Sequence, residues 1–213
     1  MNLAKGSQSW ITFAAGLLLV SGILLILFHE HSRMFLLFFL LCCIIEGFFL
    51  LFFRDPKRDI GSGVVAVADG IIRKIDTIHD EDVGESLFIS TFMNVYHVHV
   101  NRIPLSGTIQ KIMHIPGSHL PAFTKESDRN ERMVTIIKTE YGPVKIIQIA
   151  GTVARRIYHY GTSGQQVKKG DRMGIIKLGS RVDLIIPKQM ISSVHVKQGD
   201  GVRAGTTSLC SRI

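Results

Sequence analysis

Three residues that lie far apart in the sequence have side chains that could act together on a carbonyl group. They are Asp69 in A-D-G, His99 in Y-H-V-H-V and Ser180 in K-L-G-S-R-V-D-L. A carboxylate can orient an imidazole, and the imidazole can then take the proton of a hydroxyl, which makes the hydroxyl a nucleophile. Each residue alone has a simpler structural explanation, such as a turn, a bulge or a packed histidine. Together they indicate an Asp-His-Ser set.

The surroundings of Ser180 suggest which carbonyl it attacks. Ser180 follows Gly179 within a pattern that otherwise predicts β-strands, where Gly weakens the ladder. No nucleophile elbow of the hydrolase type surrounds this serine. Since the residue before it has no side chain, the carbonyl of Gly179 is within reach of the hydroxyl. The sequence therefore predicts self-cleavage between Gly179 and Ser180.

Further polar residues are candidates for binding. His97 lies two residues before His99, so in a strand both imidazole rings would point to one face. A metal site would need a third and a fourth ligand at a recognisable spacing, and these are missing, so we predict no metal. Arg155 and Arg156 could bind a phosphate or a carboxylate, because a guanidinium fork suits both anions. A solvated surface is the alternative for these two arginines.

Two apolar runs near the N-terminus predict a pair of transmembrane helices. Residues 10–28 carry no charge, and residues 34–53 carry only Glu46. At about 1.5 Å per residue, each run is long enough for a hydrocarbon core of roughly 30 Å. Two adjacent runs without a cleavage site fit a signal peptide poorly. We therefore assign residues 1–53 to a membrane anchor, in which the Glu46 carboxyl is either kept neutral or turned toward the neighbouring helix.

The basic residues beside the spans predict their orientation. Lys5 precedes the first span, and Arg54, Lys57 and Arg58 follow the second, whereas the loop between them has Arg33 beside an acidic residue. Lys and Arg favour the cytoplasmic side of a membrane. Both ends should therefore face the cytoplasm, with residues 54–213 on the cytoplasmic face of the cell's inner membrane.

Residues 54–213 contain all but two of the chain's 25 Lys and Arg and all but two of its 17 Asp and Glu, so they carry the whole formal net charge of +8. A basic domain at a membrane favours anionic lipid headgroups. The basic residues are scattered and lack an aromatic platform, which argues against nucleic acid. Cys42, Cys43 and Cys210 offer neither metal-ligand spacing nor a disulfide framework.

The same segment predicts a mainly β fold. Short β-branched or alternating runs are separated by Gly and Asp, and residues 152–160 are the best candidate for a short helix. V-K-K-G-D at Val167 recurs as V-K-Q-G-D at Val196, and A-D-G-I-I-R-K-I is echoed by L-S-G-T-I-Q-K-I. These echoes predict a compact β domain of short strands with pseudo-repeated, barrel-sandwich-like hairpins.

Five motifs in a fixed order resemble the phosphatidylserine decarboxylases of the short, membrane-anchored type. The resemblance runs from F-F-R-D-P-K-R at Phe52 to about Pro187. It includes A-D-G at Ala68, V-H-V-N-R-I-P at Val98, P-A-F-T-K-E-S-D-R-N-E-R at Pro121, I-A-G-T-V-A-R-R-I at Ile149 and G-D-R-M-G-I-I-K-L-G-S-R-V-D-L at Gly170. The family's usual cleavage motif begins L-G-S-T or G-S-S; L-G-S-R departs from the long forms and agrees with the short ones.

The resemblance implies a reaction and roles for the site residues. In the family, a serine attacks the preceding carbonyl, and the resulting ester eliminates to leave a covalent pyruvoyl group. Ser180 would be its precursor, His99 the base and Asp69 the acid that orients it. The pyruvoyl group would form a Schiff base with phosphatidylserine, release CO₂ and yield phosphatidylethanolamine, without a diffusible cofactor.

Other implications of the resemblance concern His97 and the assembly. Longer relatives have a second histidine three residues before the triad histidine, a place that Tyr96 takes here, so the role of His97 in substrate binding is open. The two chains made by self-cleavage would stay associated, and a homo-oligomer is left open.

A different class of function fits part of the pattern. The Gly-Asp hairpins resemble biotinyl or lipoyl carriers and membrane-fusion adaptors, which have no catalysis. That interpretation predicts a modifiable Lys at a hairpin tip or a long helical hairpin between half-modules, and neither is seen. One gel separates the alternatives, because the adaptor stays one chain while the decarboxylase becomes two.

Overall fold

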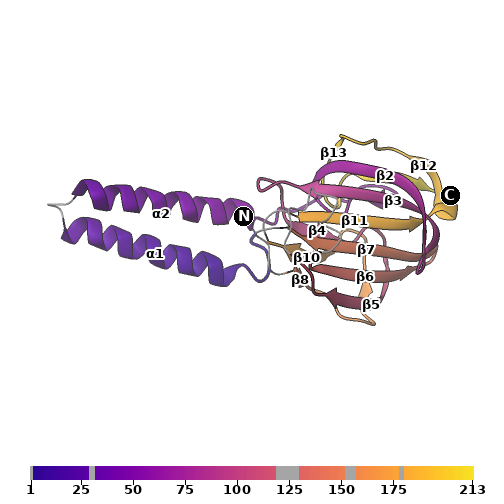
Figure 1. Ribbon diagram of the computed structural model, residues 1–213, viewed down its shortest axis with the longest axis horizontal. Helices are drawn as coiled ribbons and strands as arrows, with labels where there is room; N and C mark the ends of the chain where they lie inside the picture. Colours follow the sequence, from indigo (N-terminus) through magenta and orange to yellow (C-terminus); the bar gives the residue numbers. More distant parts are fainter. Residues whose placement is uncertain (1, 29–31, 119–129, 152–156, 178–179) are drawn as a thin grey trace. The chain divides into compact units, whose positions relative to one another are not determined.

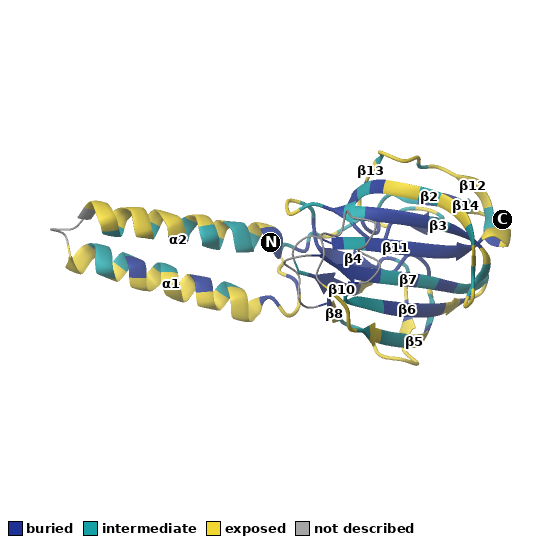
Figure 2. Ribbon diagram, viewed as in Figure 1, coloured by how far each residue is buried: buried dark blue, intermediate teal, exposed yellow. Residues whose placement is uncertain are grey.

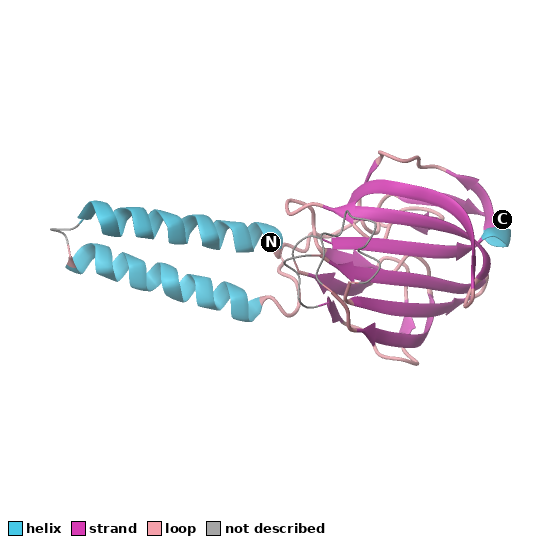
Figure 3. Ribbon diagram, viewed as in Figure 1, coloured by secondary structure: helices cyan, strands magenta, loops and turns pink. Residues whose placement is uncertain are grey.

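The computed structural model describes residues 2–28, 32–118, 130–151, 157–177 and 180–213. Contacts between residues divide the chain into two compact units, Met1–Pro56 and Lys57–Ile213. The first is helical and the second is built from β-strands (Figures 1 and 3). The predicted end of the membrane anchor, between residues 53 and 54, stays a prediction.

The first unit is a pair of apolar helices, α1 (Gln8–Leu27) and α2 (Ser32–Phe52). Their sides pack against each other, and the rings of Trp10 and Phe49 meet edge to face with centroids 5.8 Å apart. Many of their apolar side chains are exposed, and Figure 2 shows both helices largely in yellow, with teal between the yellow turns. Both helices are long and apolar enough to cross a membrane. Such exposure is unfavourable in water, so the helical pair is compatible with membrane association.

Glu46 lies in the middle of this apolar pair. Its Oε2 atom is buried, and the groove that it lines is otherwise formed by Phe39 of its own helix and by side chains of α1, including Leu19 and Ile23. Glu46 therefore lines an open groove between the two helices.

In its described residues, the second unit contains short and medium strands and a 3₁₀ turn. Their bounds are β1 (Val64–Val65), β2 (Gly70–Asp80), β3 (Gly84–Met93), β4 (Val100–Arg102), β5 (Gly107–Ile115), β6 (Arg132–Thr139), β7 (Gly142–Ala150), β8 (Ile157–His159), β9 (Gln166–Val167), β10 (Arg172–Ile176), β11 (Ser180–Pro187), η3 (Lys188–Met190), β12 (Ile191–Val194), β13 (Gly201–Val202) and β14 (Ser208–Arg212). Since β8 covers residues 157–159, the short helix suggested for residues 152–160 is wrong there.

The strands form one large sheet and two small ones. The large sheet has the order β13-β2-β3-β11-β7-β6-β5-β9, and the small sheets have the orders β4-β10-β8 and β1-β14-β12. All strand pairs are antiparallel. Figure 1 shows β3, β11, β7 and β6 side by side in the large sheet. The strand order is nearly symmetric about the β11–β7 pair, because two longer strands and then a two-residue edge strand follow on each side. The prediction of a mainly β fold with repeated hairpins is confirmed.

The repeated V-K-x-G-D motif forms the same turn twice. Asp171 and Asp200 each accept a hydrogen bond from the backbone N–H three residues earlier, at 2.7 and 2.9 Å. Gly170 and Gly199 adopt left-handed φ values of 87° and 96°, which a side chain would disfavour. The sequence echo is therefore a structural repeat.

The core of this unit lies against one face of the large sheet. Along β11, the side chains of Val182, Leu184 and Ile186 alternate toward the core, where they meet Ile89 of β3 and Ile146 of β7. Figure 2 shows β3 and β11 as buried strands. Residues at the start of β11 are thus held on both sides by buried neighbours.

Candidate active site at the start of strand β11

Ser180 is the first residue of β11, the strand between β3 and β7. It pairs with Met93 on one side and with Ala150 on the other, and it is fully buried. Because side chains alternate along a strand, Ser180 shares the core face with Val182. Among the residues that the structure describes, its buried Oγ atom has no hydrogen-bond partner. A buried hydroxyl without a partner is costly, so a functional reason is expected.

His99 is placed beside the segment that leads to Ser180. Its backbone carbonyl accepts a hydrogen bond from the N–H of Ile176 at 3.4 Å, and Ile176 precedes Ser180 by four residues. The imidazole is fully buried, and its Nδ1 atom lies 2.9 Å from the carbonyl oxygen of His97. Since only a protonated Nδ1 can donate to that carbonyl, the neutral ring carries its basic lone pair on Nε2.

Asp69 is brought to the same end of the large sheet. The N–H of Arg102 bonds the carbonyl of Val67 at 2.8 Å, so Asp69 follows a segment that runs beside β4. Gly70 comes next, and a Cβ atom there would lie 2.3 Å from the carbonyl oxygen of Phe92. The next residue of β3 after Phe92 is the one that pairs with Ser180. Only β3 therefore separates the A-D-G motif from Ser180.

The carboxylate of Asp69 has two partners in the structure. Oδ2 accepts a hydrogen bond from the guanidinium of Arg58 at 2.8 Å, and Oδ1 accepts one from the N–H of Ala204 at 2.8 Å. The Nδ1 atom of His99 contacts a backbone carbonyl instead. Within the described part of the chain, a direct hydrogen bond between Asp69 and His99 is not present. Sequence reasoning missed the ion pair between Asp69 and Arg58. The two residues are eleven positions apart, and only the folded loop before β1 brings them together.

His97 lies in a turn and not in a strand. Its Nδ1 atom accepts a hydrogen bond from the N–H of Asn94 at 2.9 Å, and its ring packs on Tyr96 with centroids 4.6 Å apart. β4 begins only at Val100. The prediction that His97 and His99 share one face of a strand is therefore wrong, because β4 begins after both residues.

Three predicted site residues lie outside the described residues. They are Gly179, Arg155 and Arg156.

Two buried amides beside the serine were not singled out by sequence reasoning. Asn101 of β4 and Gln148 of β7 are fully buried, and the Nε2 of Gln148 donates to the Oδ1 of Asn101 at 2.7 Å. Asn101 also directs its Nδ2 toward the sulfur of Met93 at 3.7 Å. In the sequence, the signal that could have found Gln148 is an amide residue at a position where strand alternation predicts a side chain that points into the core.

Comparison with known proteins assigns the chain to a family. The sequence pattern of the phosphatidylserine decarboxylase family matches residues 45–210. A phosphatidylserine decarboxylase proenzyme of Streptomyces avermitilis is 47% identical over 210 residues, which covers 98% of this chain and 93% of that protein. One of Thermobifida fusca is 39% identical over 209 residues, with coverages of 98% and 92%.

An archaeal relative is also similar over nearly its full length. A protein of Methanosarcina barkeri, provisionally named an archaetidylserine decarboxylase proenzyme, is 37% identical over 213 residues, with 98% of each chain covered. These matches confirm the predicted resemblance and the prediction of an enzyme of the carboxy-lyase class, and the chain belongs to the phosphatidylserine decarboxylase family.

Proposed function

We propose that the chain is a proenzyme that cleaves itself between Gly179 and Ser180 and then decarboxylates phosphatidylserine to phosphatidylethanolamine. The observation that carries this proposal is the setting of Ser180. Its buried hydroxyl has no hydrogen-bond partner among the described residues and stands at the start of a central strand, close in sequence to the residue that pairs with His99. The family membership of the chain supports the same reaction.

His99 is the proposed base. Its Nε2 atom is buried, and its Nδ1 atom faces the carbonyl of His97, so the ring is fixed in the tautomer that can accept a proton. Asp69 is proposed to orient His99 and to stabilise its charged form. Since Arg58 and Ala204 hold the Asp69 carboxylate in the structure, it would act through the field of its charge or after exchanging one partner.

The site residues fit a pyruvoyl group formed from Ser180. Making this group removes the Oγ atom, and among the described contacts no hydrogen bond depends on that atom. The pyruvoyl ketone supplies an electron sink for the loss of CO₂. The chain's own residues exclude water from the reacting atom, because Ser180 is fully buried and its strand partners Met93 and Ala150 are almost fully buried.

The two chains are proposed to stay associated after cleavage. Residues 180–213 supply β11 at the centre of the large sheet, β13 beside β2, and β14 between β1 and β12. The ladders of β11 with β3 and β7, of β13 with β2, and of β14 with β1 all join this segment to strands that precede residue 179. Breaking one peptide bond leaves all of these ladders in place.

Membrane attachment is proposed to bring the site to its substrate. Residues 1–53 would anchor the chain in the inner membrane, with the β unit on the cytoplasmic face, while the lipid tails stay in the bilayer. The basic surplus of residues 54–213 favours anionic lipid. Arg155, Arg156 and His97 remain proposed contacts for the headgroup.

The test is the intact mass of the purified protein together with its decarboxylase activity. Wild-type protein should show two chains, of residues 1–179 and 180–213, with the second carrying a pyruvoyl group. Ser180→Ala should remain one inactive chain. Ser86→Ala is the matched control, because Ser86 is equally buried on the neighbouring strand and its hydroxyl donates a hydrogen bond to the carbonyl of Gly84 at 2.7 Å. This variant should be processed normally.

Full activity of the Ser180→Ala variant would overturn the proposal. A wild-type chain that stays whole and inactive would favour the non-catalytic adaptor.

A further inference from the structure

A short chain of polar groups ends beside Ser180. Gln148 donates from Nε2 to the Oδ1 of Asn101 at 2.7 Å, and Asn101 donates from Nδ2 toward the sulfur of Met93 at 3.7 Å. These two contacts fix which way each amide points. The carbonyl oxygen Oε1 of Gln148 is therefore the free end of the chain.

Strand register places this oxygen near the reacting residue. Gln148 pairs with Val182 across the β7–β11 ladder, and Ala150, two residues further along β7, pairs with Ser180. Gln148 and Ser180 are thus diagonal neighbours on the core face of two adjacent strands, roughly 7–8 Å apart at their backbones and within reach of a long side chain. Met93, at the far end of the polar chain, pairs with Ser180 on its other side.

The Oε1 atom is a buried acceptor that has no hydrogen-bond partner within the described part of the chain. An apolar side chain of similar size would avoid the cost of burying such an atom. Two polar residues held fully buried at this position therefore indicate a ligand that brings its own donor.

Maturation changes what lies opposite this acceptor. Before processing, the Ser180 hydroxyl is a donor within diagonal reach. Processing removes the Oγ atom, as proposed above, and the group that must then approach residue 180 is the primary amine of the substrate. An amine or ammonium group supplies N–H donors where the hydroxyl was.

We propose that Gln148 accepts a hydrogen bond from the substrate's amino group, and that Asn101 positions Gln148 for this contact. This assignment rests on the proposed function, since it needs a mature residue 180. It makes the pair a determinant of headgroup specificity: headgroups with an N–H are favoured over those without one, because a site built around an N–H rejects an analogue that lacks it.

The experiment uses the full-length, processed protein in detergent. Two deacylated headgroups serve as probes: glycerophospho-N,N-dimethylethanolamine, which has one N–H, and glycerophosphocholine, which has none. Schiff-base formation needs a primary amine, and the probes carry a tertiary amine and a quaternary ammonium group, so neither reacts covalently with the pyruvoyl group. Dissociation constants come from ligand-induced shifts in Tm.

Wild-type protein should prefer the N–H probe by about 10- to 100-fold, the range expected for a hydrogen bond to a charged donor. Gln148→Met, which keeps the length but not the acceptor, should be processed fully on a gel and lose this preference. Asn101→Ala should reduce it in the same direction. Thr135→Val is the control: Thr135 is fully buried on β6 and contacts His159, so the preference should remain.

The possible outcomes separate this inference from the proposed function. If the wild-type chain is not processed, the proposed function fails first. If Gln148→Met is folded but stays uncleaved, Gln148 serves self-processing and the specificity role is wrong. If Gln148→Met is processed and keeps the wild-type preference, the inference is overturned. Should Gln148→Met not fold, an unchanged preference in Asn101→Ala refutes it equally.

Discussion

Asp69 has both a structural partner and a proposed catalytic role, and two substitutions can separate them. Arg58→Gln removes the guanidinium that bonds Asp69 at 2.8 Å while leaving the carboxylate in place. The side chains of the pair are only 12% and 11% exposed, so water replaces little of the lost contact. A charge-assisted hydrogen bond of this kind contributes about 1.5–3 kcal/mol. For a unit of this size, Tm should fall by about 3–12 °C.

Asp69→Asn should lower Tm by a similar amount, since it also ends the ion pair, but it should affect self-cleavage differently. If the carboxylate orients and stabilises His99, cleavage should slow by about 10²-fold or more. Arg58→Gln, which keeps the carboxylate, should slow it by less than about tenfold, the loss expected from a modest shift in position.

The assay is a time course of chain cleavage on a gel after synthesis, with Tm measured in parallel. Equal slowing in both variants would show that Asp69 acts only by holding Arg58, and the orienting role would be wrong.

Three further predictions concern acid stability, packing and the anchor. Burial lowers the pKa of His159 below its ordinary value of 6.5, so the unfolded chain binds its proton more readily than the folded one. The stability that His159 confers should be complete above about pH 6.5 and lost as the pH falls toward its folded pKa. His159→Gln should therefore flatten the dependence of Tm on pH between pH 7 and 5. An unchanged slope of Tm against pH would contradict this prediction. Gly70→Ala should destabilise the fold by about 2–4 kcal/mol in urea unfolding, because its Cβ would lie 2.3 Å from the carbonyl oxygen of Phe92, and a loss below about 0.5 kcal/mol would refute the clash. Residues 57–213 alone should fold and self-cleave but turn over liposomes more slowly than the full chain, and equal turnover in high salt would refute the anchoring role.

The fold was largely predictable because its signals are local. Uncharged runs as long as residues 10–28 have few structural solutions other than a membrane-spanning helix. The V-K-x-G-D echo predicted a repeated structural unit, and the structure has the same turn at both places, with left-handed glycines at Gly170 and Gly199. The pairing of β11 with β3 and β7 was not predictable, since register over such sequence separations depends on packing that no short motif encodes.

From the sequence, candidate catalytic residues could be proposed only where the side chain can act as a nucleophile, a base or an acid. Ser180 and His99 drew attention by residue type, whereas Gln148 is an ordinary amide until the fold buries it beside the serine. His97 shows the opposite error. Its spacing from His99 suggested a shared strand face, but β4 starts after both, so the rule of alternation did not apply.

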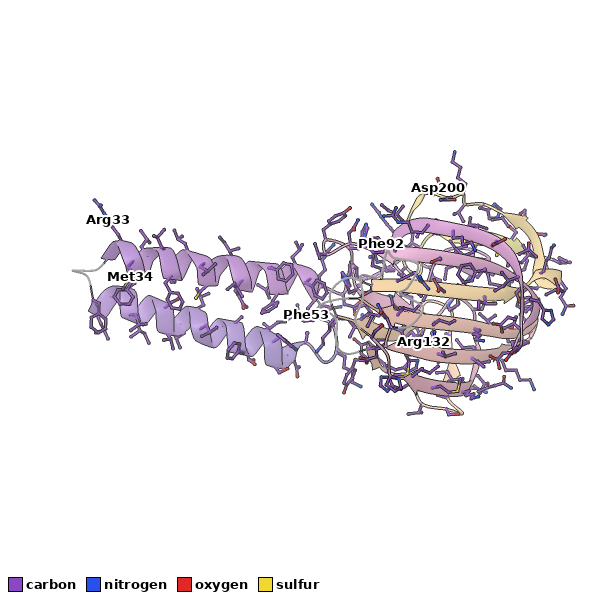
Figure 4. All side chains as sticks on the ribbon, in the orientation of Figure 1. Arg33, Met34, Phe53, Phe92, Arg132 and Asp200 are labelled. Carbon is purple, nitrogen blue, oxygen red and sulfur yellow. The ribbon has the colours of Figure 1, made fainter. Side chains whose placement is uncertain are left out.

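The architecture is compatible with the proposed chain break between residues 179 and 180. Residues 177–179 connect β10, in the sheet β4-β10-β8, to β11, in the large sheet. A break between residues 179 and 180 therefore cuts a connection between sheets and removes no strand from either. β3 and β7 pair with β11 on both sides from Ser180 to Ile185, and Figure 4 labels Phe92 of β3, the partner of Arg181. A break within β11 would instead divide this central strand into two fragments. Because the native ladder survives the proposed cleavage, the reacting residue can become a chain end and still be held in place by a buried, central strand.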